Sequence, residues 1–471
     1  MRLTLALAGL LAAISCTADK DTGAGPVCYL DADGDGFGDP DRALEGCDGS
    51  ATDNGEDCDD GDAAVHPDAD EVCGDGLDND CDGDQGCGEI PTECGDGDWT
   101  WAVDGSGASG AFFTRVQDAI DAAASGDRIC VLPGTYNEVI DFEGKDLEII
   151  GVAGWDDTVL DGAGLDSSVV SFLNGETRAS LLQGFSITGG TGQPLDQVTA
   201  PLNGGGVAIL ASSPTLRCLN IHDNTAGSGG GIIIRPDFGD SGAPLPDPLM
   251  ENIILQGNDA RSGNVGGGLS AYQGSYTLHN AVIIDNLAQR GGGVFHYELD
   301  QAVWERVVVA NNAADIYGGG LYGSALQASH VLLCGNTAGS EGDGLIVDGP
   351  DGSTSFTNSV FVQLEELGYW SALPEVTYSR TTSIAGEGNT ATEPAYDCAA
   401  LTGDLASFWS EPDALGDLGD PAGAPDPDGS TTGMGAFFGP YGDDWDLDCD
   451  GVGSGPWASP ADADDLDEDT K

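Results

Sequence analysis

Positive charge is what this sequence most lacks. Its 471 residues contain 14 Lys and Arg against 81 Asp and Glu, which gives a formal net charge of -67 at pH 7. A surface this acidic repels nucleic acid and anionic lipid, so both are excluded as partners of the folded chain. The acidity suits cations instead, although it would also keep the chain soluble in a salty habitat.

Aromatic residues and long apolar runs are also scarce. Aromatic residues make up 7% of the chain, and no segment after residue 16 is long and apolar enough to cross a bilayer. The 75 glycines lack the strict three-residue period of collagen, so they indicate frequent tight turns. The length and the 40% apolar content allow a large core and more than one domain.

The N-terminus has the features of an export signal. Arg2 precedes an apolar stretch, residues 3–14, that is too short to span a membrane. The AISC that ends at Cys16 resembles a bacterial lipoprotein box, and the resemblance implies that residues 1–15 are removed and Cys16 is lipidated. We therefore expect an exported outer-membrane or cell-surface lipoprotein with residues 16–27 as a tether, attached to the membrane only through that lipid. The alternative is an ordinary secretory signal and a secreted protein.

Cysteine is concentrated near the start of an exported chain, which indicates a disulfide framework. Besides Cys16 there are twelve cysteines, and seven of them lie between residues 28 and 94. Seven is odd, so one is expected to pair outside this stretch or to stay unpaired. The C-x2-C spacing of zinc ribbons is absent. Residues 28–95 therefore predict a small module held by disulfides and ions rather than by an apolar core.

Alternating aspartates suggest what those ions are. A tight loop points every second side chain toward one centre, and calcium takes six to eight oxygens at such a centre. The stretch DNDCDGDQGCGE, residues 78–89, fits the calcium-loop pattern D-x-[DN]-x-[DN]-G-x5-E at every specified position. A first loop begins at Asp31 but has Arg42 where the closing carboxylate would stand, so it is weaker or is completed from elsewhere.

The order of YLDADGDGFGDP, DCDDGDAAVHPDADEVC and DGLDNDCDGD resembles an Asp- and Cys-rich metal-binding motif of exported bacterial proteins, which is named after a copper-binding surface protein. The resemblance implies that the metal ligands are Asp31, Asp33, Asp35, Asp57, Asp59, Asp78, Asp80 and Asp82, and the calcium-loop pattern adds Glu89. We favour calcium over copper because these ligands are hard oxygens. His66, which precedes Pro67, is interpreted as a turn residue.

The body of the chain repeats with a period near 25 residues. Glycine triplets begin at residues 204, 229, 266, 291 and 318, a degenerate Gly-Asp-Gly follows at 342, and each of these units from 229 onward is preceded by Asn-x-Ala. These asparagines are Asn224, Asn258, Asn286, Asn312 and Asn336. The positions three and five before each asparagine are always apolar, whereas the position two before varies and is placed outward. Stacked units of this length predict a parallel β-helix with coils about 4.8 Å apart.

The start of the body and its repeats both have counterparts in known families. The amphipathic helix expected at about 113–124 would cover the open edge of the first coil. This entry looks like that of pectin-lyase-like proteins, and the GGG-[VIL] and N-x-A pattern is similar to repeats of polymorphic outer-membrane proteins. The predicted class is all-β: a right-handed parallel β-helix solenoid over residues 96–440, preceded by the disulfide-rich, metal-binding module. This fold hosts lyases, hydrolases, epimerases and adhesins, so it does not define an activity.

Residues 441–471 form an acidic tail with one more alternating loop. Asp446, Asp448 and Asp450 are its expected metal ligands. Cys449 is expected to pair with Cys398, because both lie near the end of the chain.

No catalytic signature of the β-helix enzymes is present, since Gly-His-Gly, Arg-x-Lys, Asp-Pro-His and Arg-x-Pro-x-x-Arg are all missing. The remaining candidates, interpreted as surface charges or satisfied turn residues, are Arg217, His222, Asp223, Arg235, Arg261, Arg290, His296 and Glu305. The sequence favours a non-enzymatic, calcium-binding surface protein with a structural or adhesive role and a polysaccharide or surface protein as its partner. The alternatives are a calcium-dependent polysaccharide lyase or another carbohydrate-active enzyme, and copper binding or acquisition through the N-terminal module. Carboxylates and arginine converging in a groove of the β-helix would favour an enzyme.

Overall fold

The computed structural model of the chain divides into two compact units, Met1–Glu89 and Ile90–Lys471. The structure describes residues 27–40, 42–44, 51–67, 69, 81, 91–95, 97–194, 203–239, 242–263, 265–350, 353–362, 368–369, 374–379, 381, 387–390, 398 and 421–422. The expected ligands and lipidation site that lie outside these residues are Cys16, Asp78, Asp80, Asp82, Glu89, Asp446, Asp448 and Asp450. Among the described residues, no helix is long and apolar enough to span a bilayer.

The first unit contains a small antiparallel sheet. Its strands are β1 (Cys28–Leu30), β2 (Ala43–Leu44) and β3 (Ala51–Thr52), in the order β2-β1-β3. Within the described part of this unit, the buried hydrophobic residues are only Cys28 and Val65. Cys28 is disulfide-bonded, and a second disulfide joins Cys58 to Cys81. A core this small requires cross-links or bound ions to hold the fold.

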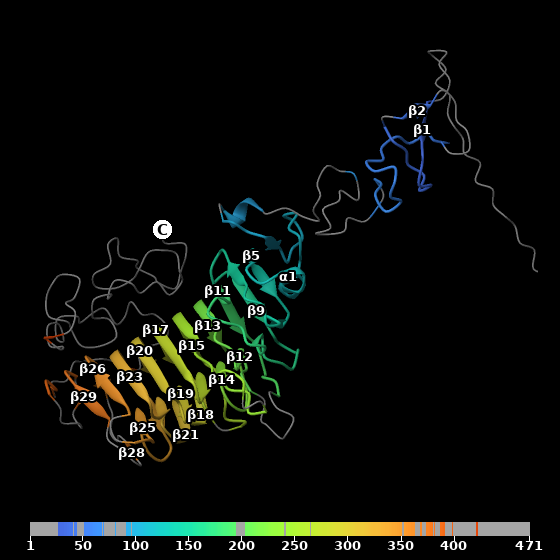
Figure 1. The fold of residues 1–471 in the computed structure, drawn as a ribbon. Coiled ribbons are helices and arrows are strands. Elements are labelled where there is room, and N and C mark those ends of the chain that lie inside the picture. Colours follow the sequence, from blue (N-terminus) through green and yellow to red (C-terminus); the bar gives the residue numbers. More distant parts are fainter. Residues whose placement is uncertain are drawn as a thin grey trace, which may run out of the picture. The chain divides into compact units, whose positions relative to one another are not determined.

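The second unit is a parallel β-helix, in which strands of successive coils lie side by side (Figure 1). The larger sheet follows the path β4 (Trp101–Val103), β5 (Arg128–Val131), β8 (Glu148–Gly151), β11 (Leu181–Thr188), β13 (Thr215–His222), β15 (Leu249–Gln256), β17 (Ser275–Ile284), β20 (Gln301–Ala310), β23 (Leu326–Cys334), β26 (Ser355–Thr357) and β29 (Glu375–Thr377). Three shorter strands pair beside this path: β6 (Gly134–Tyr136), β9 (Thr158–Asp161) and β27 (Val360–Val362).

Two further sheets complete the coils. The nine-stranded sheet consists of β7 (Ile140–Asp141), β10 (Val170–Phe172), β12 (Val207–Leu210), β14 (Ile232–Arg235), β16 (Leu269–Tyr272), β19 (Val294–Tyr297), β22 (Leu321–Gly323), β25 (Leu345–Val347) and β28 (Gly368–Tyr369). A small sheet pairs β18 (Leu287–Arg290), β21 (Ala313–Tyr317) and β24 (Thr337–Ala338). The predicted fold class is therefore confirmed.

The long strands of the larger sheet each bend at one residue. The pairing of β13 with β15 skips Cys218 and Asn252, whose φ angles of 51° and 55° lie in the left-handed region. The same conformation recurs at the corresponding positions Asn280, Arg306 and His330. The bend divides each strand into two arms, so a coil has three faces: the nine-stranded sheet and the two arms.

The interior of the coils is apolar, as the repeat predicts. The residues three and five positions before each asparagine of the repeat, such as Ile221 and Leu219, are all buried in the apolar core. At the position two before, His222 and Gln256 face outward and are half-buried. Cys334 also faces outward, yet it is fully buried, because a disulfide binds it to Cys398. This bond shows that the expected Cys398–Cys449 pairing is wrong: two cysteines near the chain end need not be partners when a coil passes closer.

The asparagines of the repeat form a ladder that joins the coils. The side-chain Nδ2 of Asn286 donates to Oδ1 of Asn312 at 3.0 Å and to the backbone oxygen of Leu255 at 2.8 Å. In turn, Oδ1 of Asn286 accepts hydrogen bonds from the backbone and side-chain nitrogens of Asn258. The same pattern runs from Asn224 to Asn336, and these side chains are almost completely buried. The buried amides of these five asparagines thus have hydrogen-bond partners.

A short helix, α1 (Val116–Ala122), lies at the start of the β-helix and packs against β4 and β7. The carboxylate of Glu138 accepts hydrogen bonds from the backbone N–H groups of Val116 and Gln117, so it caps the helix N-terminus. Cys94, which precedes β4 in the second unit, forms a disulfide with Cys130 of β5. One cysteine of the crowded stretch therefore pairs outside it, as the odd count allows.

Replacing Asn286 by Ala is expected to destabilise the β-helix by about 2–4 kcal/mol, because several buried backbone and side-chain groups lose their partners at once. Urea unfolding followed by far-ultraviolet circular dichroism measures the change. Gln289→Ala is the control, since the Gln289 amide makes an exposed hydrogen bond to Arg261. Equal losses in the two variants would contradict a structural role for the ladder.

Candidate metal centre and a pocket on the β-helix

Three aspartates after β1 point toward one centre. Asp31, Asp33 and Asp35 are half-buried while the residues between them are exposed, and one carboxylate oxygen of each lies within 4.8 Å of the others. Gly34 and Gly36 have φ angles of 90° and 105°, a conformation that side chains with a Cβ rarely adopt. The alternation seen in the sequence therefore produces the convergence that it predicts.

Two more carboxylates reach this cluster from residues 57–60. Oδ1 of Asp60 accepts a hydrogen bond from the backbone N–H of Ala32 at 2.7 Å. Asp57 is 2% exposed and lies close enough to interact electrostatically with Asp60 and with the first loop. Asp59, the neighbour expected from the sequence as a ligand, is exposed instead, and its backbone N–H donates to Oδ1 of Asp57. The structure thus places Asp60, rather than Asp59, at the centre.

Four carboxylate oxygens of the cluster are buried without a hydrogen-bond donor among the described residues. They are the Oδ2 atoms of Asp33, Asp35, Asp57 and Asp60. In each of these four groups, Oδ1 accepts a hydrogen bond from a backbone N–H, which fixes the carboxylate. A buried carboxylate oxygen without a partner costs roughly 1–3 kcal/mol or more. The oxygens are arranged as ligands for a cation, which would remove that cost.

Crowding also changes the protonation of the cluster. Burial raises the pKa of Asp33, and the charges of Asp35, Asp31 and Asp60 raise it further against one backbone hydrogen bond. Burial and neighbouring carboxylates raise the pKa of Asp57 in the same way. A bound cation favours the charged forms, so its affinity should fall as the pH falls through these raised pKa values.

Neither Arg42 nor His66, two other polar residues near the cluster, takes the place of a cation there. Arg42 occupies the twelfth position of the first loop and lies 3.7 Å from Oδ2 of Asp60, but its side chain is 57% exposed and balances little charge. The carboxylates of Asp57 and Asp60 therefore supply the oxygen ligands that Arg42, at the twelfth position, cannot provide. His66 stacks on Phe37, and its backbone oxygen accepts a hydrogen bond from Ala69, as a turn residue would.

Cys81 links the second acidic loop to this cluster. Its disulfide with Cys58 holds this one residue of the 78–89 stretch at the position that follows Asp57. The ligands expected from residues 78–89 lie outside the described residues, so their coordination stays a prediction.

Several charged residues that the sequence singled out make structural contacts. Arg217 pairs with Glu251 at 2.9 Å, and Arg261 pairs with Asp259. Glu305 pairs with Arg306 at 3.1 Å. Arg235 lies over the ring of Phe238 at 4.8 Å. The interpretation as satisfied surface charges agrees with these contacts for Arg217, Arg261 and Glu305, whereas Arg235 is buried.

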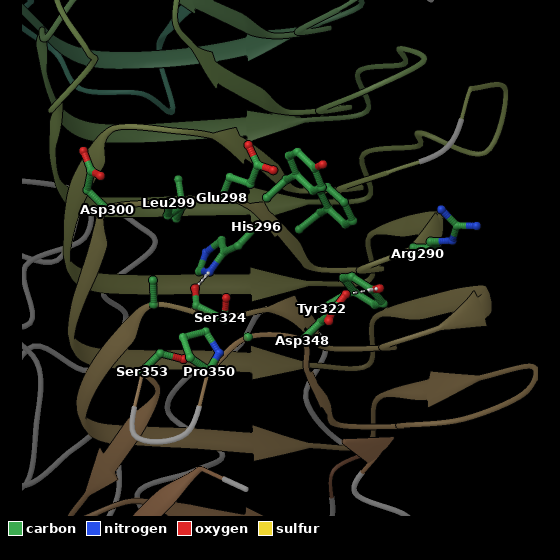
Figure 2. A pocket seen from close by; sticks show the side chains of 14 residues that line it. Arg290, His296, Glu298, Leu299, Asp300, Tyr322, Ser324, Asp348, Pro350 and Ser353 are labelled. Atoms are coloured by element: carbon green, nitrogen blue, oxygen red, sulfur yellow. Dashed lines mark hydrogen bonds between the residues drawn. The ribbon is translucent and has the colours of Figure 1, made fainter. Parts of the chain in front are cut away.

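Arg290 is different, because it lines a pocket of about 620 Å³ on the β-helix (Figure 2). The pocket lies where β18, β19, β22 and the segment after β25 meet. Its charged and aromatic lining includes Arg290, Tyr297, Glu298, Asp300, Tyr322 and Asp348. Tyr297 is 51% exposed, whereas the Tyr322 hydroxyl donates to Asp348 at 2.9 Å. Carboxylates and an arginine therefore line one hollow, a feature that no sequence motif indicated, but they do not converge: Figure 2 shows Arg290 and Asp300 at opposite ends of it.

His296 contributes to the pocket wall but is not available as a base. Its Nε2 lies 2.6 Å from the Tyr276 hydroxyl, which also accepts a hydrogen bond from the Trp304 indole. Burial lowers the pKa of His296 to about 4, so the ring is neutral at pH 7. This histidine is part of the core of the coil.

Comparison with protein families identifies one segment. Residues 57–85 match the family "Cu-binding_MopE: Putative metal-binding motif". The match includes Asp57, Asp60 and the Cys58–Cys81 disulfide, and the loop at 31–36 lies before it. No curated protein matches the chain significantly.

Similar solved structures are carbohydrate-active proteins. A pectate lyase, Pel9A, is 14% identical with a TM-score of 0.39, and the alignment covers 72% of this chain and 95% of the lyase. A pectin methylesterase in complex with a hexasaccharide is 12% identical with a TM-score of 0.34, covering 65% and 96%. A pectin methylesterase from carrot is 9% identical with a TM-score of 0.30, covering 62% and 86%. Similarity this low says nothing about activity, and the fold rests on the strand pairing itself. The chain therefore combines a metal-binding motif of the Cu-binding MopE type with a parallel β-helix.

Proposed function

We propose that the chain is an exported surface protein that binds calcium through its N-terminal unit, and that the pocket on its β-helix has a non-enzymatic, adhesive or ligand-binding role. The observation that carries the calcium assignment is the set of four buried Oδ2 atoms in the Asp31–Asp60 cluster. The lipoprotein-like signal supports attachment at the cell surface through Cys16.

Calcium fits this cluster better than copper for a chemical reason. The converging atoms are carboxylate oxygens, which calcium prefers, whereas copper favours imidazole and sulfur ligands. The one imidazole close by, His66, stacks on Phe37, and both Cys58 and Cys81 are used in a disulfide. A cation held here would tie β1 and its loop to residues 57–60 in a unit that has almost no apolar core.

Asp60→Asn is expected to weaken calcium binding about tenfold or more, because the variant loses one charged ligand, worth on the order of 1–3 kcal/mol. Asp59→Asn is the matched control: the same substitution, one residue away, at an exposed side chain, and it should change the affinity by less than about twofold. Isothermal titration calorimetry of the oxidised full chain measures both. Tight copper binding without any heat from calcium would overturn the calcium assignment.

The pocket supports a saccharide as the partner of the β-helix. An exposed tyrosine ring can stack on the apolar face of a sugar, and carboxylates can accept hydrogen bonds from its hydroxyls. Three carboxylates against one arginine favour a neutral saccharide over an anionic one. Binding is favoured over cleavage, because His296 is buried, and because the one metal-binding group found among the described residues lies in the first unit.

Tyr297→Ala is expected to weaken saccharide binding about tenfold, since stacking on an exposed ring contributes on the order of 1–1.5 kcal/mol. Phe238→Ala is the control, because this ring is 56% exposed but does not line the pocket. A glycan array followed by titration of the best neutral oligosaccharide provides the measurement. Release of unsaturated, ultraviolet-absorbing product from any polysaccharide would instead establish the alternative, a lyase.

A further inference from the structure

A serine, a histidine and an aspartate form a hydrogen-bonded chain on the outer face of β11 and β13. Oγ of Ser186 lies 3.0 Å from Nε2 of His222. Nδ1 of the same ring lies 2.9 Å from Oδ2 of Asp223. None of the three lines the pocket or belongs to the aspartate cluster.

The coil geometry explains why these residues meet although 36 positions separate Ser186 from His222. In β11, Phe185 and Ile187 point into the core, so Ser186 points outward. In β13, the core residues on either side of Asn220 likewise leave Asn220 and His222 on the outer face. The pairing of Ser186 with Asn220 places the two strands in neighbouring coils.

Asp223 follows His222 directly, at the corner of the coil. Its φ angle of 53° turns the chain, and its carboxylate reaches Nδ1 of the preceding ring. An aspartate at Nδ1 accepts the Nδ1–H and so leaves Nε2 as an acceptor for the serine hydroxyl. This is the tautomer that a general base beside a serine nucleophile requires.

Asn220 lies beside Ser186 in the neighbouring coil. Its Oδ1 is buried without a hydrogen-bond partner among the described residues, and as an acceptor this atom cannot stabilise an oxyanion. The face therefore holds a nucleophile, a base and an orienting carboxylate on two adjacent coils.

We propose that this group is a second functional site, which cleaves small uncharged carboxylic esters by acyl transfer to Ser186. Oγ of Ser186 bonds to the carbonyl carbon while His222 takes the hydroxyl proton; the bond to the alcohol oxygen then breaks, and His222 returns the proton to the departing alcohol. Water then adds to the acyl carbon while His222 takes its proton; the bond from that carbon to Oγ breaks, His222 returns the proton to Oγ of Ser186, and the acid leaves. The net charge of -67 disfavours anionic esters, and the 5% exposure of Ser186 restricts the acyl group to a small one.

The exposure of Asp223 determines how much this carboxylate is expected to contribute to kcat. Its side chain is 75% exposed, against 28% for His222, so water screens its effect on the imidazolium. Asp223 is thus a positioning residue, and Asp223→Asn should lower kcat about tenfold, far less than the roughly 10⁴-fold loss in a buried triad, with KM unchanged.

The test uses the oxidised full chain with a fluorophosphonate probe and with p-nitrophenyl acetate. The expected result is covalent labelling of the peptide that contains Ser186, and ester hydrolysis that Ser186→Ala removes. His222→Ala should lower hydrolysis by about 10²-fold or more, and added imidazole should restore part of it. Ser212→Ala is the control, because Ser212 is a buried serine that donates to Glu176 and has no histidine beside it.

Wild-type labelling decides the matter without any variant that could misfold. Absence of labelling in a chain with the normal circular dichroism spectrum overturns the proposal. So does labelling, or hydrolysis, that Ser186→Ala leaves at the wild-type level.

Discussion

Carboxylate oxygens that are buried without a hydrogen-bond donor among the described residues constrain the N-terminal unit more than any other feature. Backbone N–H groups satisfy one oxygen of Asp33, Asp35, Asp57 and Asp60, and the second oxygen of each points into the cluster. In the part of this unit that the structure describes, Cys28 and Val65 are the buried hydrophobic residues, too few to offset that cost. Cross-linking by Cys58–Cys81 limits the freedom of the unfolded chain, but it does not neutralise charge. A bound cation would hold the carboxylates together and would also remove the repulsion between them.

The β-helix solves the same problem of buried polar groups without an ion. Its turns bury asparagine side chains, and each of these donates to the next coil and to a backbone oxygen. The end members are also satisfied, because Oδ1 of Asn224 accepts from the backbone N–H of Gly190 and Nδ2 of Asn336 donates to the backbone oxygen of Val309. The helix α1 and the Cys94–Cys130 disulfide lie at the start of the β-helix. Two groups of polar side chains lie on the outer surface of the β-helix. The pocket lies across β19 and β22, and the Ser186–His222–Asp223 chain lies on an arm of β11 and β13.

The repeat period allowed the fold to be predicted from the sequence, whereas the membership of the sites became clear only from the structure. The two-residue alternation before each asparagine identified the inward residues, because a strand has only two sides. The alternation of Asp31, Asp33 and Asp35 likewise predicted their convergence. The choice between Asp59 and Asp60 depends on the turn after Asp57, which no pattern specifies. The bends at Cys218 and Arg306 were invisible for a similar reason, since residues of unlike type share that conformation.

Hydrogen exchange, read by mass spectrometry on the oxidised full chain, tests most directly whether a cation organises the first unit. The account predicts that calcium, compared with a chelator, slows exchange in peptides from residues 27–60 and leaves peptides from residues 207–347 unchanged. That pattern would separate a unit that depends on the cation from one that depends on its asparagine ladder. Identical exchange of residues 27–60 with and without calcium would contradict the account, because the carboxylates would then be held together by the protein alone.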